Sequence, residues 1–172
     1  IYSDNTALTN AKLFTTDYTV SSGCGTWGDN VSWTFDAQSK TLTISGEGQM
    51  VDEWHMGELL GRYDYIYEGS RPWDIYKYDI EKVVVSDGIT HIGMNNFRFF
   101  PNLKEVVIPA SVTQIGSLAF RTDEKLTDVY YMGTEEQWNS IVIGKENEPL
   151  LNATIHYNYV GCEHNYEEVG VT

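Results

Sequence analysis

The sequence is poor in basic residues, and this shortage limits the partners that the protein can have. Its 172 residues include 11 Lys and Arg against 25 Asp and Glu, which gives a formal net charge of −14. Nucleic acid and anionic lipid both attract proteins with a surplus of basic side chains, so neither is expected as a partner. The plain interpretation of the acidic surplus is solubility, and a Ca²⁺-rich surface or a cationic partner is the alternative.

The sequence is also poor in cysteine and has no long apolar run. Cys24 and Cys162 stand near opposite ends, and their spacing does not decide whether they form a bridge. No run approaches the ~20 apolar residues that span a bilayer, so no membrane insertion is expected within this segment. The first residue is Ile1 and no signal peptide precedes it, which favours a mature or excised fragment whose targeting information is missing.

What the sequence does contain is enough apolar material for one folded domain. Hydrophobic residues make up 41% and aromatic residues 13%, which argues against a mainly disordered chain. The 12 tyrosines and 5 tryptophans suit surfaces that are apolar in body and polar at the tip.

The dominant pattern is a 23-residue stretch that occurs twice in succession. Residues 80–102 read IEKVVVSDGITHIGMNNFRFFPN, and residues 103–125 read LKEVVIPASVTQIGSLAFRTDEK. A third unit begins in register at Leu126 and then diverges. A fixed period of this length predicts a solenoid of stacked units. The aligned identities are Val83/Val106, Val84/Val107, Thr90/Thr113, Ile92/Ile115, Gly93/Gly116, Phe97/Phe120 and Arg98/Arg121.

Within each repeat, three consecutive apolar residues from Val83 or Val106 predict a short strand, followed by turn residues and a second apolar pair. Gly93 and its counterpart then favour a tight helical or 3₁₀ piece that buries Phe97 or Phe120.

The flanking segments predict elements that cover the two ends of the repeats. Alternating apolar residues in 31–35 and 41–45, joined by a polar turn, predict a β-hairpin over the first repeat. After the repeats, Thr134 and Gln137 form a capping box that opens a helix. An inward apolar stripe of Trp138, Ile141 and Val142 and a closing strand at 153–157 follow.

These segments predict an α+β repeat fold: a short solenoid of 23-residue repeats with a β-hairpin N-terminal cap and a helix-plus-strand C-terminal cap. Residues 1–158 are expected to form a single capped domain, and residues 159–172 a linker or the start of a truncated module. Within the domain, we expect an N-terminal cap at 20–79 with an insertion at 53–69, two repeats at 80–125 and a C-terminal cap at 126–158.

The segment LKEVVIPASVTQIGSLAF (103–120) resembles the units of the BspA-like leucine-rich repeat family. SGCG (22–25), TLTISGEGQM (41–50) and PWDIYKYDI (72–80) are similar to its N-terminal cap, and GTEEQWNSI (133–141) with NEPLLNATIHY (147–157) to its C-terminal cap. The resemblance covers about residues 20–158. It implies a bacterial secreted or cell-surface protein that acts in adhesion and recognition.

Three features depart from the family's pattern. Phe100 and Asp123 stand where the family often has Cys, and Asn96 replaces the usual Ala before Phe97. The first repeat is therefore expected to pack differently. The segment from about Glu53 to Gly69 is longer than the family's cap needs, so it is specific to this protein.

No motif supports catalysis, a metal or a cofactor. Gly23 to Gly28 matches G-x-G-x-x-G, but a strand pattern follows where a dinucleotide fold needs a helix. His55 lies among Asp52, Glu53 and Glu58, which is more simply a set of solvated charges than a metal site. Cys162 and His164 are half of a zinc site at most. No G-x-S-x-G occurs, and Cys24 has no neighbouring His. We therefore expect no catalytic residue, no metal and no cofactor.

Two surfaces are candidates for binding. Because strand side chains alternate, inward Val83 and Val85 leave Val84 outward, and the same holds in the next two units. If the insertion does not fold over it, this ladder marks an interface. The rival is the aromatic insertion, since rings at a surface stack on sugars and anchor protein partners. The ladder residues are Val84, Val107 and Tyr130, flanked by Lys82, Glu105 and Asp128, and the insertion residues are Trp54, Tyr63, Tyr65 and Tyr67.

The sequence thus favours a monomeric, non-catalytic interaction or adhesion module whose partner is a protein or glycan at the cell surface. A carbohydrate-binding module attached to a larger secreted enzyme is the alternative, motivated by the Tyr and Trp surplus. A structural spacer that presents other domains is the third hypothesis.

Overall fold

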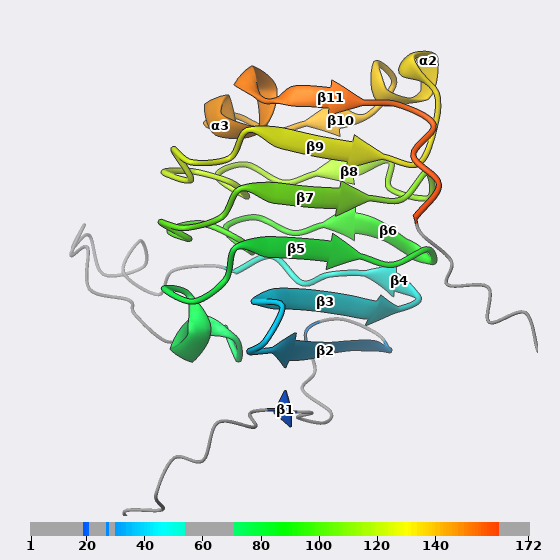
Figure 1. Ribbon diagram of the computed structural model, residues 1–172. Coiled ribbons are helices and arrows are strands. Elements are labelled where there is room, and N and C mark those ends of the chain that lie inside the picture. The colour runs from blue at the N-terminus through cyan, green and yellow to red at the C-terminus, as the bar shows by residue number, and fades with distance from the viewer. Residues whose placement is uncertain (1–18, 21–26, 28–29, 54–70, 162–172) are drawn as a thin grey trace, which may run out of the picture.

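The computed structural model describes residues 19–20, 27, 30–53 and 71–161, and its strands form two sheets that lie face to face (Figure 1). The larger sheet has the order β1-β2-β3-β5-β7-β9-β11, and the smaller has the order β10-β8-β6-β4. The larger sheet contains β1 (Thr19–Val20), β2 (Val31–Asp36), β3 (Thr41–Gly46), β5 (Lys82–Val85), β7 (Glu105–Ile108), β9 (Asp128–Tyr131) and β11 (Thr154–His156). The smaller sheet contains β4 (Gly48–Gln49), β6 (Ile89–Ile92), β8 (Gln114–Ile115) and β10 (Val142–Ile143).

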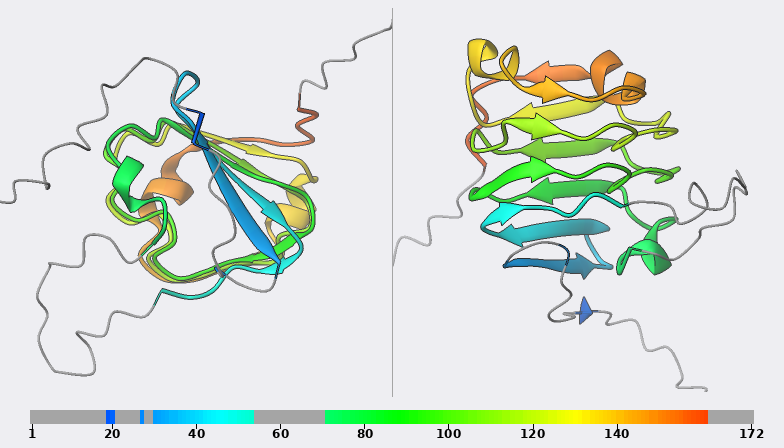
Figure 2. Two further views of the ribbon diagram at one scale, coloured as in Figure 1. Left: turned by 90° about the horizontal axis from the view of Figure 1, so that it is seen from below. Right: turned by 180° about the vertical axis from the view of Figure 1, so that it is seen from behind.

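The strands of the repeated stretch lie side by side in parallel. Lys82 pairs with Glu105 and Glu105 with Asp128, so neighbouring strands are offset by the length of the repeated stretch. After each of these strands the chain crosses to the smaller sheet, passes through a series of turns and returns one level higher. Seen along the stack, the successive levels superimpose (Figure 2).

The core lies between the two sheets and is closed by the turns. Val83, Val106 and Val129 are fully buried on the inner face of the larger sheet, and Ile92 is fully buried on the smaller one. The rings of Phe97 and Phe120 stack level upon level, with centroids 5.4 Å apart. Burial of these identical positions is what the sequence predicts.

The predicted hairpin is present and extends the larger sheet. Val31, Trp33 and Phe35 are buried and alternate with exposed residues, because β2 pairs antiparallel with β3 and faces the core on one side. β3 then pairs in parallel with β5, so the hairpin continues the stack below the first repeat.

A strand occurs at the second apolar pair of each repeat, which is a difference from the sequence prediction: β6 contains both Ile89 and Ile92, and β8 contains Ile115. The glycine after it leads into turns, so the predicted helical or 3₁₀ piece is wrong. The reason is that the backbone N–H groups here bond between levels: Asn95 N donates to Ser117 O, Phe97 N to Ala119 O and Phe99 N to Arg121 O. These donors are therefore not available for a helix. Among the described residues one 3₁₀ helix occurs, η1 (Asp74–Tyr76), and it precedes the first repeat.

The capping box is confirmed at the C-terminal end. Gln137 N donates to Thr134 Oγ1, and Thr134 N donates to Gln137 Oε1 at 2.8 Å. Helix α2 (Glu135–Trp138) is short, and α3 (Glu148–Asn152) follows before the closing strand β11. The inward position predicted for Val142 is wrong: the residue is 66% exposed, because the helix ends at Trp138 and Val142 lies in β10.

Candidate functional site: the outer face of the larger sheet

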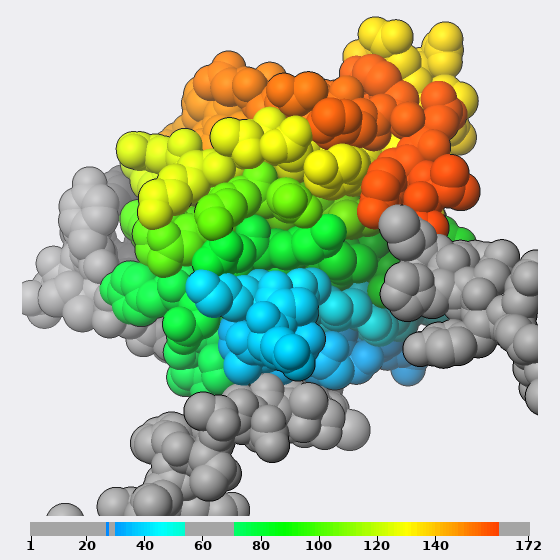
Figure 3. Space-filling view, in the orientation of Figure 1, coloured from blue at the N-terminus to red at the C-terminus, as the bar shows by residue number. Residues whose placement is uncertain are grey.

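One row of side chains runs across the outer face of the larger sheet, perpendicular to its strands. The register aligns the predicted ladder residues Val84, Val107 and Tyr130 in adjacent strands, and it adds three residues from the flanking strands. We call the complete set the outer row, and Figure 3 views the face on which it lies. The outer row consists of Thr34, Thr43, Val84, Val107, Tyr130 and His156.

The apolar ladder within the outer row is less exposed than an interface ladder would be. Val84 and Tyr130 are partly exposed, but Val107 is only 6% exposed, so the expectation of an exposed side chain is wrong for this residue. Val107 stands between Val84 and Tyr130 on the two adjacent strands, and the larger tyrosine beside it limits access to solvent.

Three rings gather at one end of the outer row. The His156 ring stacks on Tyr130, with centroids 4.7 Å apart and planes 14° apart. The Tyr159 ring lies 4.9 Å from Tyr130 at 47°, and its backbone N–H donates to Tyr131 O at 3.0 Å. We call Tyr130, His156 and Tyr159 the ring cluster. His156 was not among the predicted binding residues, although it pairs with Tyr130 in the adjacent strand and therefore lies on the same face.

Ionic groups beside the outer row pair with one another across strands. Lys82 Nζ lies 3.1 Å from Glu105 Oε2 and 5.9 Å from the Tyr130 ring. His156 Nε2 lies 2.8 Å from Asp128 Oδ1, and this hydrogen bond, with one from Thr127, lowers the pKa of Asp128. Desolvation, with help from the charges of Glu105 and Asp128, raises the pKa of Tyr130.

A second ion-paired set lies at the N-terminal ends of the same strands. Lys40 Nζ and Lys104 Nζ each lie 2.5 Å from a different carboxylate oxygen of Glu81. These two hydrogen bonds lower the pKa of Glu81 to about 2. The face thus presents charges that are held by cross-strand partners.

The insertion residues Trp54, Tyr63, Tyr65 and Tyr67 lie outside the described residues, as do both cysteines. Asp52 Oδ1 accepts a hydrogen bond from Met94 N at 2.6 Å and lies 3.3 Å from His91 Nε2. Within the described ranges, no group of three or more His, Cys, Asp or Glu residues is arranged to hold a metal ion.

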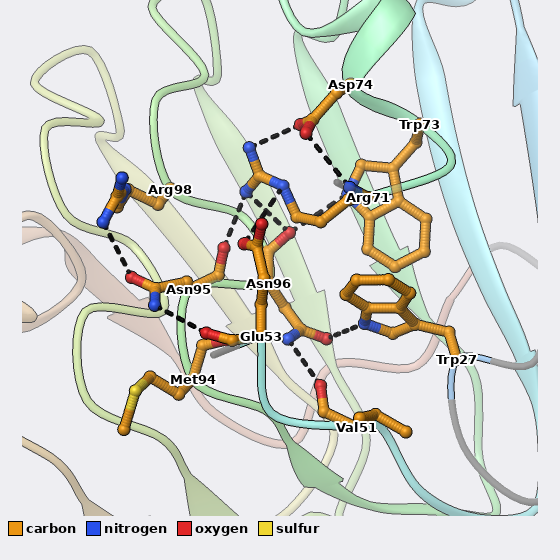
Figure 4. A network of polar contacts seen from close by, with 10 residues as sticks. All are labelled: Trp27, Val51, Glu53, Arg71, Trp73, Asp74, Met94, Asn95, Asn96 and Arg98. Atoms are coloured by element: carbon orange, nitrogen blue, oxygen red, sulfur yellow. Dashed lines mark hydrogen bonds and ion pairs between the residues drawn. The ribbon is translucent and has the colours of Figure 1, made fainter. Parts of the chain in front are cut away.

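A buried polar network joins four parts of the chain next to the first repeat (Figure 4). Asn96, which the sequence predicted would change the packing, is fully buried at its centre. Its Nδ2 donates to Val51 O and Met94 O, both at 2.9 Å, and its Oδ1 accepts from Trp27 Nε1 at 2.7 Å. An alanine here would remove all three bonds and leave Val51 O and Trp27 Nε1 without this partner, whereas Met94 O would still accept from Glu53 N, so the asparagine has a structural role that alanine cannot fill.

The same network contains a buried arginine among carboxylates. Arg71 donates to the carbonyls of Asn95 and Asn96, and its guanidinium lies 2.5 Å from Asp74 Oδ1 and 3.7 Å from Glu53 Oε2. Burial is the main cause that raises the pKa of Glu53, and the charge of Arg71 opposes it. The network fixes Glu53 against Arg71.

Asp123, the second departure from the family's pattern, is a fully buried acid. Its Oδ1 accepts a hydrogen bond from Phe100 N at 2.8 Å, and its Oδ2 has no hydrogen-bond partner among the described residues. Burial raises the pKa of Asp123 well above its ordinary value, against the opposing effects of this hydrogen bond and of Arg71.

Comparison with known proteins identifies the repeated part of the chain. Residues 74–143 match the family model of the BspA type leucine rich repeat region (6 copies). The crystal structure of a leucine-rich repeat protein from Eubacterium ventriosum is similar, with a TM-score of 0.54 and 25% sequence identity. The similarity covers 69% of this chain and 27% of that protein, so this chain spans just over a quarter of its relative. No curated protein matches the chain. In the part that the structure describes, no helix has the length and apolar character needed to cross a membrane.

Proposed function

Because this chain carries a leucine-rich repeat region of the BspA type, we propose that it is a non-catalytic module that binds another protein. We further propose that it is a short solenoid of 23-residue repeats within a single domain, residues 1–158. In this proposal a hairpin-bearing segment at 20–79 caps the repeats of 80–125 on one side. A helix-plus-strand segment at 126–158 caps them on the other.

The observation that carries the proposal is the outer row with its ring cluster. The register holds Val84, Val107 and Tyr130 in line on strands that the core fixes in place. A rigid face loses little conformational entropy when a partner binds. Tyrosine is enriched among the residues that dominate binding energy at interfaces, and Tyr130 lies at the centre of the ring cluster. Glu105 and Asp128, which flank the row, would fix the orientation of the partner.

The insertion remains a rival surface. Trp54, Tyr63, Tyr65 and Tyr67 provide aromatic anchors of the same chemical kind. Glu53 and Arg71, which flank residues 54–70, are both buried and lie 3.7 Å apart at their charged groups. The charged groups of the two residues that flank this segment are therefore held together beside the first repeat.

A carbohydrate-binding module of a larger secreted enzyme is the second candidate. The ring cluster favours it, because aromatic rings provide faces for sugar stacking and the neighbouring Asp128 and Glu105 accept hydrogen bonds from hydroxyl groups. For either candidate we propose adhesion or recognition by a monomeric, bacterial, secreted or cell-surface protein, as is typical of this family.

The test measures binding of the labelled chain to arrays of extracellular proteins and of glycans. Tyr130→Ala removes the centre of the ring cluster, and Tyr78→Ala is the matched control, since Tyr78 is 61% exposed outside the outer row. We expect the chain to bind a protein ligand. Tyr130→Ala should lower the affinity for this ligand at least tenfold, and Tyr78→Ala should leave it unchanged. If Tyr65→Ala abolishes binding instead, the insertion is the binding surface. Glycan binding that depends on Tyr130 in the same way would favour the second candidate. Absence of binding on both arrays would contradict the proposal and favour a structural spacer.

A further inference from the structure

Two arginines occupy the same place in adjacent levels of the stack, away from the outer row. Arg98 lies in the turns between β6 and β7, and Arg121 lies one level higher, in the turns between β8 and β9. The residue after Arg98 donates its backbone N–H to Arg121 O at 3.2 Å, so the two levels are in direct contact. Both arginines are partly exposed, on a chain whose net charge is −14.

The charge of Arg98 is only partly compensated. Among the described residues its side chain has one hydrogen-bond partner, the neutral Asn95 Oδ1 at 3.1 Å, and it forms no ion pair (Figure 4). By contrast, Arg121 pairs with Glu146 at 3.3 Å. Burial lowers the pKa of Arg98, and the charges of Arg71 and Arg121 add to this effect, whereas those of Glu53 and Asp74 oppose it. An added anion would relieve this repulsion.

An exposed ring stands beside this pair in a rare backbone conformation. Phe99 has φ of 64° and is 39% exposed. The left-handed conformation is a feature of this turn in both repeats, and here it places an exposed ring beside the arginine. The Arg98 guanidinium lies 4.5 Å from the Phe99 ring, which orients its planar group and leaves nitrogens available for a ligand. Thr122 has the same conformation in the next level, without a ring.

We propose that Arg98, Arg121 and Phe99 form a binding site for a carboxylate on an acidic peptide segment of a partner protein. A carboxylate matches the planar fork of a guanidinium, and the ring offers an apolar surface to the side chain next to the acid. The site contains the arginine that both 23-residue units share, and this arginine is partly exposed in both units. It is separate from the outer row, so its test does not depend on the result for Tyr130.

The test uses the full chain labelled with ¹⁵N and two short peptides. One has two glutamates around a leucine, and the other has glutamines in place of the glutamates. We expect the acidic peptide to shift the Phe99 amide and the Arg98 Nε–H signals in a saturable way, and the neutral peptide to bind at least tenfold more weakly. Raising the salt concentration should weaken the binding of the acidic peptide, because salt screens the attraction between its glutamates and the arginines.

Variants decide whether these residues form the site. Arg98→Gln should lower the affinity for the acidic peptide at least tenfold, and Arg121→Gln should lower it severalfold. Lys125→Gln, which removes an exposed cation bonded to Asn102 Oδ1, is the matched control and should change nothing. Thermal melting and the unperturbed outer-row signals verify that each variant is folded. Equal binding of both peptides, or full binding by folded Arg98→Gln, would overturn the proposal. Binding of inorganic phosphate without binding of the peptide would also overturn it.

Discussion

Asn96 and Asn147 occupy equivalent places in two levels of the stack, each three residues after a glycine, and both are fully buried. Asn147 Nδ2 donates to Gly116 O at 3.0 Å in the level below and to Gly144 O at 2.9 Å in its own level, and Asn96 Nδ2 likewise donates to Val51 O in the level below and to Met94 O in its own. The level between them has Ala119 at this place. Each asparagine thus satisfies backbone carbonyls of its own level and of the level below.

Asn96→Ala is expected to lower the free energy of unfolding by about 2–4 kcal/mol, because it removes three hydrogen bonds and leaves the Val51 carbonyl and the Trp27 indole without this partner, although Met94 O still accepts from Glu53 N. Chemical denaturation measures the change. Asn139→Ala, at an exposed residue, is the control and should change stability by less than about 0.5 kcal/mol. A small effect at Asn96 would mean that water replaces the amide.

Gly116→Ala is expected to destabilise the chain by about 3 kcal/mol through overpacking. An added Cβ would overlap the backbone of Met94 in the level below and stand 2.8 Å from the carbonyl carbon of Gly93. The matched change is Gly161→Ala, where the added Cβ would lie 3.9 Å from Tyr159 Cε1, an ordinary van der Waals contact. Thermal melting of both variants tests this, and equal melting temperatures would show that the levels can separate without cost.

The Glu81 carboxylate is expected to titrate at pH about 2 by NMR, because it accepts hydrogen bonds from Lys40 and Lys104. The folded pKa lies below the unfolded value, so this contribution to stability is present above the unfolded pKa and is lost as pH falls toward 2. In Lys104→Gln the titration should move toward the ordinary value of 4.5. An unchanged titration would show that the pairing is not maintained in solution.

How far the sequence predicts this structure depends on the range of the contacts involved. Val83, Val84 and Val85 alternate between faces as a period of two requires, so their register with the next unit follows from the repeat itself. The hydrogen bond from Trp27 to Asn96 joins residues 69 positions apart, and no local pattern signals such a partner. Val142 was placed inward because its spacing fits a helix, but the helix ends at Trp138 and a strand follows. The ring cluster was missed in part because Tyr159 reaches Tyr130 from beyond the last strand.

Asp123→Asn is expected to change how stability depends on pH. The folded pKa of Asp123 lies well above the unfolded value, so its protonated form favours the folded state at low pH. That contribution is lost as pH rises from about 3.8 through the folded pKa, since the buried group must then lose its proton. Asparagine keeps the oxygen that accepts from Phe100 N and cannot ionise.

The melting temperature of Asp123→Asn relative to the unmodified chain should therefore rise as the pH increases above about 4, whatever its offset at pH 4. Glu124→Gln, at the exposed neighbour, is the control and should show no such trend. Parallel melting curves for Asp123→Asn and the unmodified chain across this range would contradict the prediction. They would mean that a counter-charge or water reaches the second oxygen of Asp123.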